Sequence, residues 1–264
     1  MKLGFIGTGN MASAMMGGIL NNQILSVDEV MGSNPGSQKR ESVKKQFGIY
    51  VTADNNEVVE KADVIVLSVK PQFYEEVISE IREFIRENQI VITIAPGKTL
   101  AWLTEKFGKE VKLVRTMPNT PALVGAGMTA MCPNEHMTEE EITYVRTLLE
   151  SFGRVEIVSE RLMDTVVSIS GSSPAYVFMM IEAMADAAVS GGMPRAQAYQ
   201  FAAQAVMGSA KMVLETGKHP GELKDMVCSP GGTTIEAVRT LEEYGFRSGI
   251  IEAMKVCEEK SKSM

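Results

Sequence analysis

Residues 2–12 read Lys2-Leu3-Gly4-Phe5-Ile6-Gly7-Thr8-Gly9-Asn10-Met11-Ala12, and this stretch decides the fold. A short apolar run, typical of a buried strand, leads into a GxGxxA motif, and a helical pattern follows it. Gly7 permits the tight turn, Gly9 lets the backbone approach a pyrophosphate, and Ala12 is small enough for the helix to pack closely on the strand. The free N–H groups at the start of the helix would face the phosphates. The stretch therefore predicts a dinucleotide-binding site.

Outward from this motif, short apolar runs alternate with helical patterns up to about residue 158. The expected strands are residues 2–6, 29–33, 63–69, 90–95, 111–116, 129–132 and 155–158, and the expected helices are residues 10–22, 36–47, 73–87 and 139–152. Strand–helix alternation of this kind indicates a doubly wound parallel sheet. We expect a Rossmann-type α/β domain over residues 1–159.

The strand signals stop after this domain, and residues 160–264 are expected to form an all-α domain. From Thr165 to Ala210 only Glu182, Asp186 and Arg195 are charged, and Gly191-Gly192 separates two helical patterns. Helices so poor in charge must be covered on most sides. The favoured interpretation is an extensive subunit interface. The alternative is a tightly packed monomeric bundle.

The composition is that of an ordinary globular protein, with 264 residues, 45% hydrophobic, 22% charged and a formal charge of −7. This excludes a disordered chain and makes nucleic acid an unexpected partner. Cys132, Cys228 and Cys257 form neither a disulfide framework nor a zinc pair, which fits a reducing compartment. His136 and His219 are the only histidines, so a His triad or a multi-His metal site is not expected.

The chain is also expected to be soluble, cytoplasmic and free of a membrane span. The apolar stretch near residue 2 is too short for a signal peptide. The nearest approach to an uncharged apolar run is Ala175 to Val189, and it carries Glu182 and Asp186.

The residues at the end of the second expected strand indicate the type of dinucleotide. NAD sites usually place an acid there, about 20 residues after the glycines, to hold the ribose hydroxyls. Here the chain has Ser33 and Asn34, with Lys39 and Arg40 close behind. Small donors and nearby cations suit a 2′-phosphate, so NADP(H) is favoured and NAD(H) is the alternative. The two cations could equally lie on a solvated helix face.

The most informative segment of the helical half is Ser229-Pro230-Gly231-Gly232-Thr233-Thr234, which runs directly into an amphipathic helix. Successive N–H groups in such a loop form a concave anion site, which the helix N-terminus strengthens. Thr233 or Thr234 could instead serve only as an N-cap. Capping needs one hydroxyl and no glycine pair, so the combination favours a small carboxylate ligand.

Two further loops follow expected strands. Val69-Lys70-Pro71 and Met117-Pro118-Asn119 come at the carboxyl ends of strands, which is where open α/β sheets bind ligands. These loops could lie beside the nicotinamide, or they could serve only as rigid turns, and the sequence favours neither interpretation.

Lysine is absent between Lys112 and Lys211. Hydroxyacid dehydrogenases with a GxGxxA domain and a helical second domain use a lysine of the helical part as general acid. Reduction of a carbonyl needs a proton donor for the developing alkoxide, whereas a protonated C=N bond needs a hydride and positioning. The sequence therefore points towards an imine substrate.

Five motifs in order and spacing resemble the pyrroline-5-carboxylate reductase family over essentially the whole chain. They are Gly7-Thr8-Gly9-Asn10-Met11-Ala12, Val69-Lys70-Pro71, Arg115-Thr116-Met117-Pro118-Asn119-Thr120-Pro121, Gly171-Ser172-Ser173-Pro174-Ala175-Tyr176 and Ser229-Pro230-Gly231-Gly232-Thr233-Thr234. The resemblance implies NAD(P)H-dependent reduction of 1-pyrroline-5-carboxylate to L-proline, the last step of proline biosynthesis. It also implies a Rossmann domain followed by a dimerisation domain, in homodimers that can assemble as a decamer of five dimers.

The resemblance also implies roles for individual residues. The substrate carboxylate would lie on the backbone around Gly231, Gly232 and Thr233, with Ser229 beside it, and the catalytic Thr234 would place its hydroxyl against the ring nitrogen. The residues expected to bind the cofactor are Gly7, Thr8, Gly9, Asn10, Met11, Ser33, Asn34, Asn55, Val69, Lys70, Pro71, Met117, Pro118 and Asn119. No metal is expected. Ser173 and Pro96 depart from the family, which usually has Gly and Ala at these positions.

Two rival functions share the predicted fold. One is an imine or hydroxyacid oxidoreductase with another small substrate. The other is a non-catalytic NADP-binding regulator, which would have no need for a carboxylate site in the loop from Ser229 to Thr234.

Overall fold

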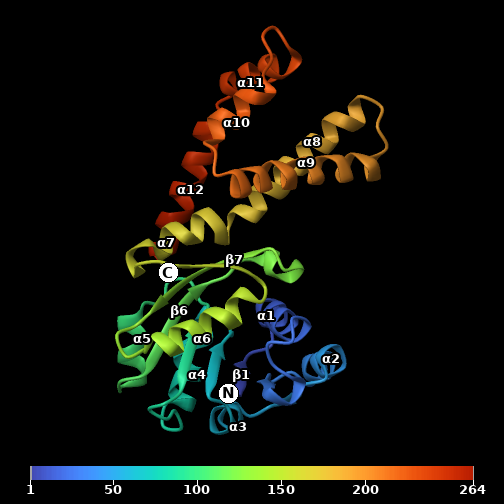
Figure 1. Cartoon of the computed structure of the whole chain (residues 1–264). Coiled ribbons are helices and arrows are strands. Elements are labelled where there is room, and N and C mark those ends of the chain that lie inside the picture. The colour runs from blue at the N-terminus through green and yellow to red at the C-terminus, as the bar shows by residue number, and fades with distance from the viewer. Residues whose placement is uncertain (1, 264) are drawn as a thin grey trace. The chain divides into compact units, whose positions relative to one another are not determined.

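The computed structural model describes residues 2–263, which form two compact units (Figure 1). The described residues up to Ser172 and those from Cys257 onward make the first unit, and Ser173–Val256 make the second. The boundary between these units lies later than the predicted domain boundary between residues 159 and 160. That the domains meet between residues 159 and 160 stays a prediction.

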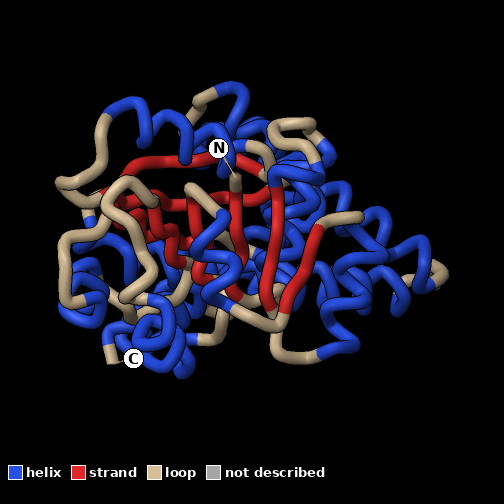
Figure 2. The backbone as a smooth tube through the Cα atoms, turned by 90° about the horizontal axis from the view of Figure 1, so that it is seen from below, coloured by secondary structure: helices blue, strands red, loops and turns tan. Residues whose placement is uncertain are grey.

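The first unit is built on an eight-stranded sheet whose strands lie among helices (Figure 2). Its strands are β1 (Leu3–Ile6), β2 (Val30–Ser33), β3 (Tyr50–Thr52), β4 (Val64–Leu67), β5 (Ile90–Thr93), β6 (Lys112–Met117), β7 (Gly127–Pro133) and β8 (Gly153–Ile157). The spatial order is β3-β2-β1-β4-β5-β6-β7-β8, and the strands from β3 to β6 are parallel. The first six positions have the strand order of a Rossmann fold, which confirms the predicted fold class.

The expectation that every strand would be parallel is wrong at one edge. β7 is antiparallel to β6, and β8 is parallel to β7. Only a 3₁₀ segment, Thr120–Val124, connects β6 to β7. A parallel crossover needs a dozen or more residues, usually with a helix, so this connection is too short to return the chain for a parallel strand.

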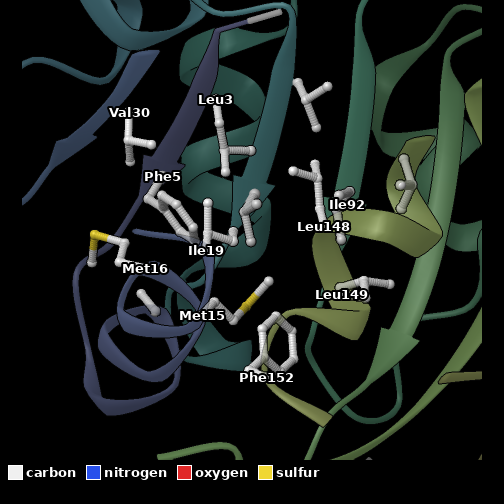
Figure 3. Packing of buried hydrophobic residues seen from close by; sticks show 14 of the residues in the cluster. Leu3, Phe5, Met15, Met16, Ile19, Val30, Ile92, Leu148, Leu149 and Phe152 are labelled. Atoms are coloured by element: carbon white, nitrogen blue, oxygen red, sulfur yellow. The ribbon is translucent and has the colours of Figure 1, made fainter. Parts of the chain in front are cut away.

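The two faces of the sheet carry separate apolar cores. The helices of this unit are α1 (Asn10–Asn21), α2 (Ser37–Phe47), α3 (Asn55–Lys61), α4 (Tyr74–Ile81), α5 (Leu100–Phe107), α6 (Glu139–Glu150) and α7 (Met163–Val166). Figure 3 shows Phe5 among Met15, Ile19 and Phe152 in one core, which α1 and α6 share. The opposite core joins side chains of β4 and β5 to those of α3, α4 and α5. Helices on both faces explain why the strands are apolar throughout.

Several elements differ from the sequence prediction. The strand β3 and the helices α3 and α5 were not expected. β3 has only three residues and one buried side chain, Val51, so it carries almost no apolar signal. The predicted helix over residues 73–87 is shorter, because α4 ends at Ile81.

The second unit is helical. It contains α8 (Ser173–Ser190), α9 (Arg195–Thr216), α10 (Pro220–Val227), α11 (Thr233–Glu243) and most of α12 (Phe246–Lys262). α8 and α9 are separated at Gly191-Gly192 as predicted, and they lie side by side (Figure 1).

Large apolar side chains of these helices are exposed. Phe178 on α8 and Phe201 on α9 are each 62% exposed, and Leu214 is 59% exposed. The alternative of a tightly packed monomeric bundle would bury such residues, so the exposure argues against it. The helical segment Glu160–Ser190 is also long and apolar enough to cross a membrane by length and composition alone, and 6% of its most apolar window is buried. An uncovered subunit interface gives the same pattern.

The last turns of α12 belong to the first unit. The Ser261 hydroxyl is buried and donates to Asp164 Oδ1 at 2.6 Å, and Cys257 Sγ donates to the Ser172 hydroxyl oxygen at 3.2 Å. The first unit is therefore closed by a segment that follows the second unit in the sequence.

Candidate functional site

The turn after β1 has the geometry that the glycine motif requires. Gly7 has a φ of 90°, and a Cβ there would lie 2.9 Å from both Ser68 O and Val69 Cγ1. The Ser68 hydroxyl donates to Gly7 O at 2.6 Å, which fixes the turn against the end of β4. Gly9 is the N-cap of α1, and a Cβ there would meet nothing within 4 Å. The start of α1 is thus open for close approach of a ligand.

A cleft of about 500 Å³ lies beside this turn, at the carboxyl edge of the sheet. Its lining residues are Gly7, Thr8, Gly9, Asn34, Pro35, Ala53, Asn55, Ser68, Val69, Lys70, Phe73, Glu76, Val77 and Glu80. Seven of the predicted cofactor residues meet here: Gly7, Thr8, Gly9, Asn34, Asn55, Val69 and Lys70. Residues from four different parts of the chain therefore converge on one concave site.

Thr8 provides a polar group that the protein itself leaves unused. The residue is fully buried, and within residues 2–263 its Oγ1 has no hydrogen-bond partner. A buried hydroxyl without a partner costs free energy, so its presence needs an explanation. A phosphate oxygen bound at the start of α1 would satisfy it.

The far end of the cleft is shaped by β3. Because β3 pairs with β2 in parallel, Thr52 lies opposite Ser33 and the chain then enters α3 at Asn55. The Ser33 hydroxyl donates to Asn55 Oδ1 at 2.6 Å. Ser33 is therefore linked to the cleft through Asn55, although it does not itself line the cleft.

Arg40 is also fixed at this end. Its Nη1 donates to the carbonyl oxygens of Asn34, at 2.9 Å, and Pro35, at 2.8 Å. The Arg40 side chain is half-buried and held by the backbone, and its role in binding a phosphate stays a prediction. Its charge is held beside the loop that follows β2, where a 2′-phosphate would be attracted.

Tyr74 fixes the ends of two neighbouring strands close to the cleft. Its buried hydroxyl donates to Leu67 O and accepts from the Ile94 N–H. Burial raises the pKa of the Tyr74 hydroxyl, so the group keeps its proton and both hydrogen bonds. The carboxyl ends of β4 and β5 are thereby held in register.

Besides Ser33, six predicted cofactor residues do not line the cleft: Asn10, Met11, Pro71, Met117, Pro118 and Asn119. The buried Asn119 side chain is occupied within the unit. Its Nδ2 donates to Ser170 O at 3.0 Å, and its Oδ1 accepts from the Met128 N–H at 2.8 Å. Asn119 thus ties the loop after β6 to β7 and to the π-helical turn Val167–Gly171.

The predicted carboxylate loop lies in the second unit and is a tight turn. The Gly232 N–H donates to Ser229 O at 3.0 Å, and Gly231 has a φ of 69°. Pro230 at the second position and a left-handed glycine at the third are typical of a type II turn. The chain enters α11 directly after this turn.

Gly232 is the N-cap residue of α11, so Thr233 and Thr234 occupy the first two helical positions. The interpretation of either threonine as the N-cap is therefore wrong. Glycine has no side chain with which to cap the helix, and the first-turn N–H groups have no partner within a helix. Those N–H groups and the positive end of the helix dipole suit a bound carboxylate.

One wall of the cleft is not predicted from the sequence. Phe73, Glu76, Val77 and Glu80 recur at the spacing that places side chains on one side of a helix. The sequence pattern of this segment predicts only a charged helix. The signal that could have found this wall is its position directly after Val69-Lys70-Pro71.

The cleft fits a dinucleotide with a 2′-phosphate. The start of α1 is open, the Thr8 hydroxyl is buried and unused, and Ser33 and Asn34 replace the acid of an NAD site. These residues would hold a pyrophosphate at one end and an adenosine ribose at the other.

Two family models match the chain. The model for pyrroline-5-carboxylate reductase dimerisation matches residues 160–264, and the model for NADP oxidoreductase, coenzyme F420-dependent, matches residues 2–97.

Similar proteins cover the whole chain. The pyrroline-5-carboxylate reductase of Escherichia coli is 54% identical over 263 residues, which are 100% of this chain and 98% of the relative. The reductase of Methanosarcina acetivorans is 40% identical, over 100% of this chain and 97% of the relative. The crystal structure of Plasmodium falciparum pyrroline carboxylate reductase with NADP bound matches with a TM-score of 0.91 and 34% identity, over 99% of this chain and 97% of that chain.

Proposed function

Because the chain belongs to the pyrroline-5-carboxylate reductase family, we propose that its Ser229–Gly232 turn and the start of α11 bind the substrate carboxylate. The chain is an NAD(P)H-dependent oxidoreductase that reduces the C=N bond of 1-pyrroline-5-carboxylate to give L-proline, the last step of proline biosynthesis. Its cofactor is NADP(H). The sequence prediction of fold, activity and cofactor is thereby confirmed.

The observation that carries the proposed substrate site is the start of α11 with glycine as its N-cap. The proposed carboxylate site is the backbone around Gly231, Gly232 and Thr233, with Ser229 beside it. The Gly232 N–H donates to Ser229 O within the turn, so the proposed donors to the carboxylate are the neighbouring N–H groups of Gly231 and Thr233. The left-handed backbone of Gly231 supports this geometry, since it turns the chain sharply into the helix. The helix dipole adds a favourable field for the negative charge.

Thr234 is the proposed catalytic residue. It lies at the second position of α11, one residue beyond the carboxylate site, and its hydroxyl is not used as an N-cap. With the carboxylate fixed, a hydrogen bond from the protonated ring nitrogen to the hydroxyl oxygen of Thr234 sets the orientation of the C=N bond. Correct orientation of two reactants removes an entropic part of the barrier. The protein need not supply a strong acid, because the imine nitrogen is protonated before reduction.

The first unit holds the cofactor in this proposal. Gly7, Thr8, Gly9, Asn10 and Met11 form the pyrophosphate end, and Ser33, Asn34 and Asn55 form the ribose end. The residues towards the nicotinamide are Val69, Lys70, Pro71, Met117, Pro118 and Asn119. Bound NAD(P)H supplies the hydride. Arg40 and the lack of an acid after β2 support a preference for NADPH over NADH.

The helical unit is the proposed homodimer interface, and five dimers form a decamer. The exposed apolar faces of α8 and α9 and the match to a dimerisation model support an obligate contact between copies. Burial of these faces in an oligomer keeps the protein soluble, and we propose that it works in the cytoplasm.

The proposal is tested by a crystal structure of the protein with NADP and L-proline. The expected result places the proline carboxylate on the N–H groups of Gly231 and Thr233 and the ring nitrogen within hydrogen-bond distance of the Thr234 hydroxyl. Proline bound elsewhere, with this turn empty, would refute the proposed site. NADPH oxidation assayed with pyrroline-5-carboxylate, a six-membered cyclic imine and 3-oxoacids separates the substrate from its rivals. A regulator would bind the cofactor and reduce none of them.

A further inference from the structure

The side chain of Asn55 is shared between two partners in the cofactor cleft. The Ser33 hydroxyl donates to Asn55 Oδ1 at 2.6 Å, and Asn55 Nδ2 donates to Glu80 Oε2 at 2.8 Å. Both ends of the amide are therefore engaged. The hydrogen bond to the carboxylate is charge-assisted, which makes it stronger than one between neutral groups.

Glu80 comes from a different element of the cleft than the usual ribose-binding acid. That acid normally stands at the end of the second strand, where this chain has Ser33 and Asn34. Glu80 lies on α4 and lines the same cleft as Asn34 and Asn55. A carboxylate is therefore present at the ribose end after all, supplied by a helix instead of a strand.

We propose that Glu80 is a specificity-determining residue for the cofactor, because its carboxylate competes with a 2′-phosphate for Asn55 and lowers the preference for NADPH over NADH. The inference rests on the proposed role of the cleft in binding the adenosine ribose. A 2′-phosphate that hydrogen-bonds to Asn55 Nδ2 must displace the Glu80 oxygen or lie beside it. Either arrangement is unfavourable, because Glu80 loses its hydrogen bond in the first and two anions lie side by side at one amide group in the second.

A 2′-hydroxyl meets no such repulsion. It can donate to the Glu80 carboxylate, as the hydroxyls of NAD(H) do to the acid of other Rossmann domains. Arg40 acts in the opposite sense from the loop after β2, where it is held by two backbone carbonyls. The balance between a fixed guanidinium and the Glu80 carboxylate would therefore set the ratio in which the two cofactors are used.

The test compares Glu80→Ala and Glu80→Gln with Glu76→Gln in the full-length protein. Glu76 lines the same cleft on the same helix, so its replacement removes the same charge without removing the hydrogen bond to Asn55. Binding of 2′,5′-ADP and 5′-AMP is measured by calorimetry at low and high salt, and kcat/KM is measured with NADPH and NADH. The wild-type enzyme is measured alongside.

We expect Glu80→Ala to raise the NADPH-to-NADH ratio of kcat/KM by about three- to tenfold, and to tighten 2′,5′-ADP by a similar factor relative to 5′-AMP. Glu80→Gln should give at least half of this effect on a logarithmic scale, and high salt should reduce it. Glu76→Gln should change the ratio by less than twofold. An unchanged or lower ratio in Glu80→Ala, or an equal rise in Glu76→Gln, overturns the inference while the enzyme remains active. A wild-type protein that binds neither nucleotide overturns the cofactor site itself.

Discussion

The guanidinium of Arg115 lies 3.0 Å from the carboxylate of Glu160, measured from Nη1 to Oε1, in the first unit. The Arg115 side chain is 3% exposed and the Glu160 side chain 31% exposed. The same Glu160 oxygen accepts from the Leu100 N–H at 2.7 Å. One carboxylate therefore holds β6, the start of α5 and the segment that leads to the helical unit.

Loss of either partner of this pair should destabilise the first unit. Arg115→Met leaves Glu160 with one fewer partner and should lower the free energy of unfolding by about 3 kcal/mol. Glu160→Gln keeps an acceptor but leaves the nearly buried guanidinium unneutralised, and should cost a comparable amount. Chemical denaturation followed by tryptophan fluorescence measures both. A change below about 0.5 kcal/mol would show that the pair contributes little.

Removal of the Thr234 hydroxyl should slow the reaction. If this group bonds the ring nitrogen, Thr234→Ala lowers kcat/KM about ten- to a hundredfold, equivalent to about 1–3 kcal/mol of transition-state binding. Thr234→Ser keeps the hydroxyl and should recover most of the rate. Thr233→Ala is the matched control, because Thr233 takes part only through its backbone. Equal losses in Thr233→Ala and Thr234→Ala would reduce both to structural roles.

The backbone of Gly231 should limit what the turn tolerates. A Cβ at this position would meet nothing within 4 Å, so the cost of Gly231→Ala comes from its φ of 69° alone. That strain is about 1–2 kcal/mol for alanine and smaller for asparagine. We expect Gly231→Ala to raise KM for the imine several-fold, Gly231→Asn to raise it less, and neither to change KM for NADPH. Equal KM values for the imine in wild type, Gly231→Ala and Gly231→Asn would show that the turn does not bind the substrate.

A charge on the exposed apolar face of α9 should dissociate the oligomer. Phe201 is 62% exposed in the single chain, and a buried unpaired glutamate at an interface costs several kcal/mol. Phe201→Glu should therefore shift the protein to smaller species in analytical ultracentrifugation, raising the dissociation constant at least a hundredfold, while cofactor binding persists. Lys211→Glu, at an exposed position of the same helix that pairs with Glu215, is the control. An unchanged sedimentation coefficient in Phe201→Glu would place the interface elsewhere.

The stability of the first unit should depend on pH through Glu57. A hydrogen bond from Lys61, with others from Thr52 and Tyr50, lowers the pKa of Glu57 from 4.5 to about 2. A lowered folded-state pKa means that the stabilisation is present above about pH 4.5 and is lost as the pH falls towards 2. Glu57→Gln should thus be less stable than wild type at pH 7, by about 1 kcal/mol or less, and the difference should shrink between pH 4.5 and 2.

Unfolding curves at several pH values would measure this dependence. Glu83→Gln is the control, because the Glu83 side chain is 80% exposed. A difference in the free energy of unfolding between wild type and Glu57→Gln that stays constant from pH 7 to 2 would contradict the lowered pKa of Glu57.

The local parts of the fold could be predicted because their signals are short-range. Gly7, Gly9 and Ala12 identify the turn, and the apolar runs of β1 and β4 identify central strands. Gly191-Gly192 separates two helices whose lack of charge indicates an interface. Each of these inferences depends only on neighbouring residues and on burial.

The parts that failed depend on contacts across the chain. The direction of β7 follows from the length of its connection to β6, and no residue within β7 encodes it. The third strand contributes only Val51 to the core, so its pairing, which brings Asn55 beside Ser33, has no periodic signal. Glu80 was missed because its meaning comes from a residue 25 positions earlier in the chain.

The hydrogen bonds of Ser261 with Asp164 and of Cys257 with Ser172 can form only after the end of the chain has been synthesised. As the polypeptide leaves the ribosome, the sheet and its helices emerge first and can fold early. The Asp164 carboxylate and the Ser172 hydroxyl nevertheless lack these partners, and are exposed to water, until residues 173–256 have been translated. A nascent chain arrested before residue 257 would therefore have a nucleotide-binding unit that lacks the last turns of α12 and their two hydrogen bonds.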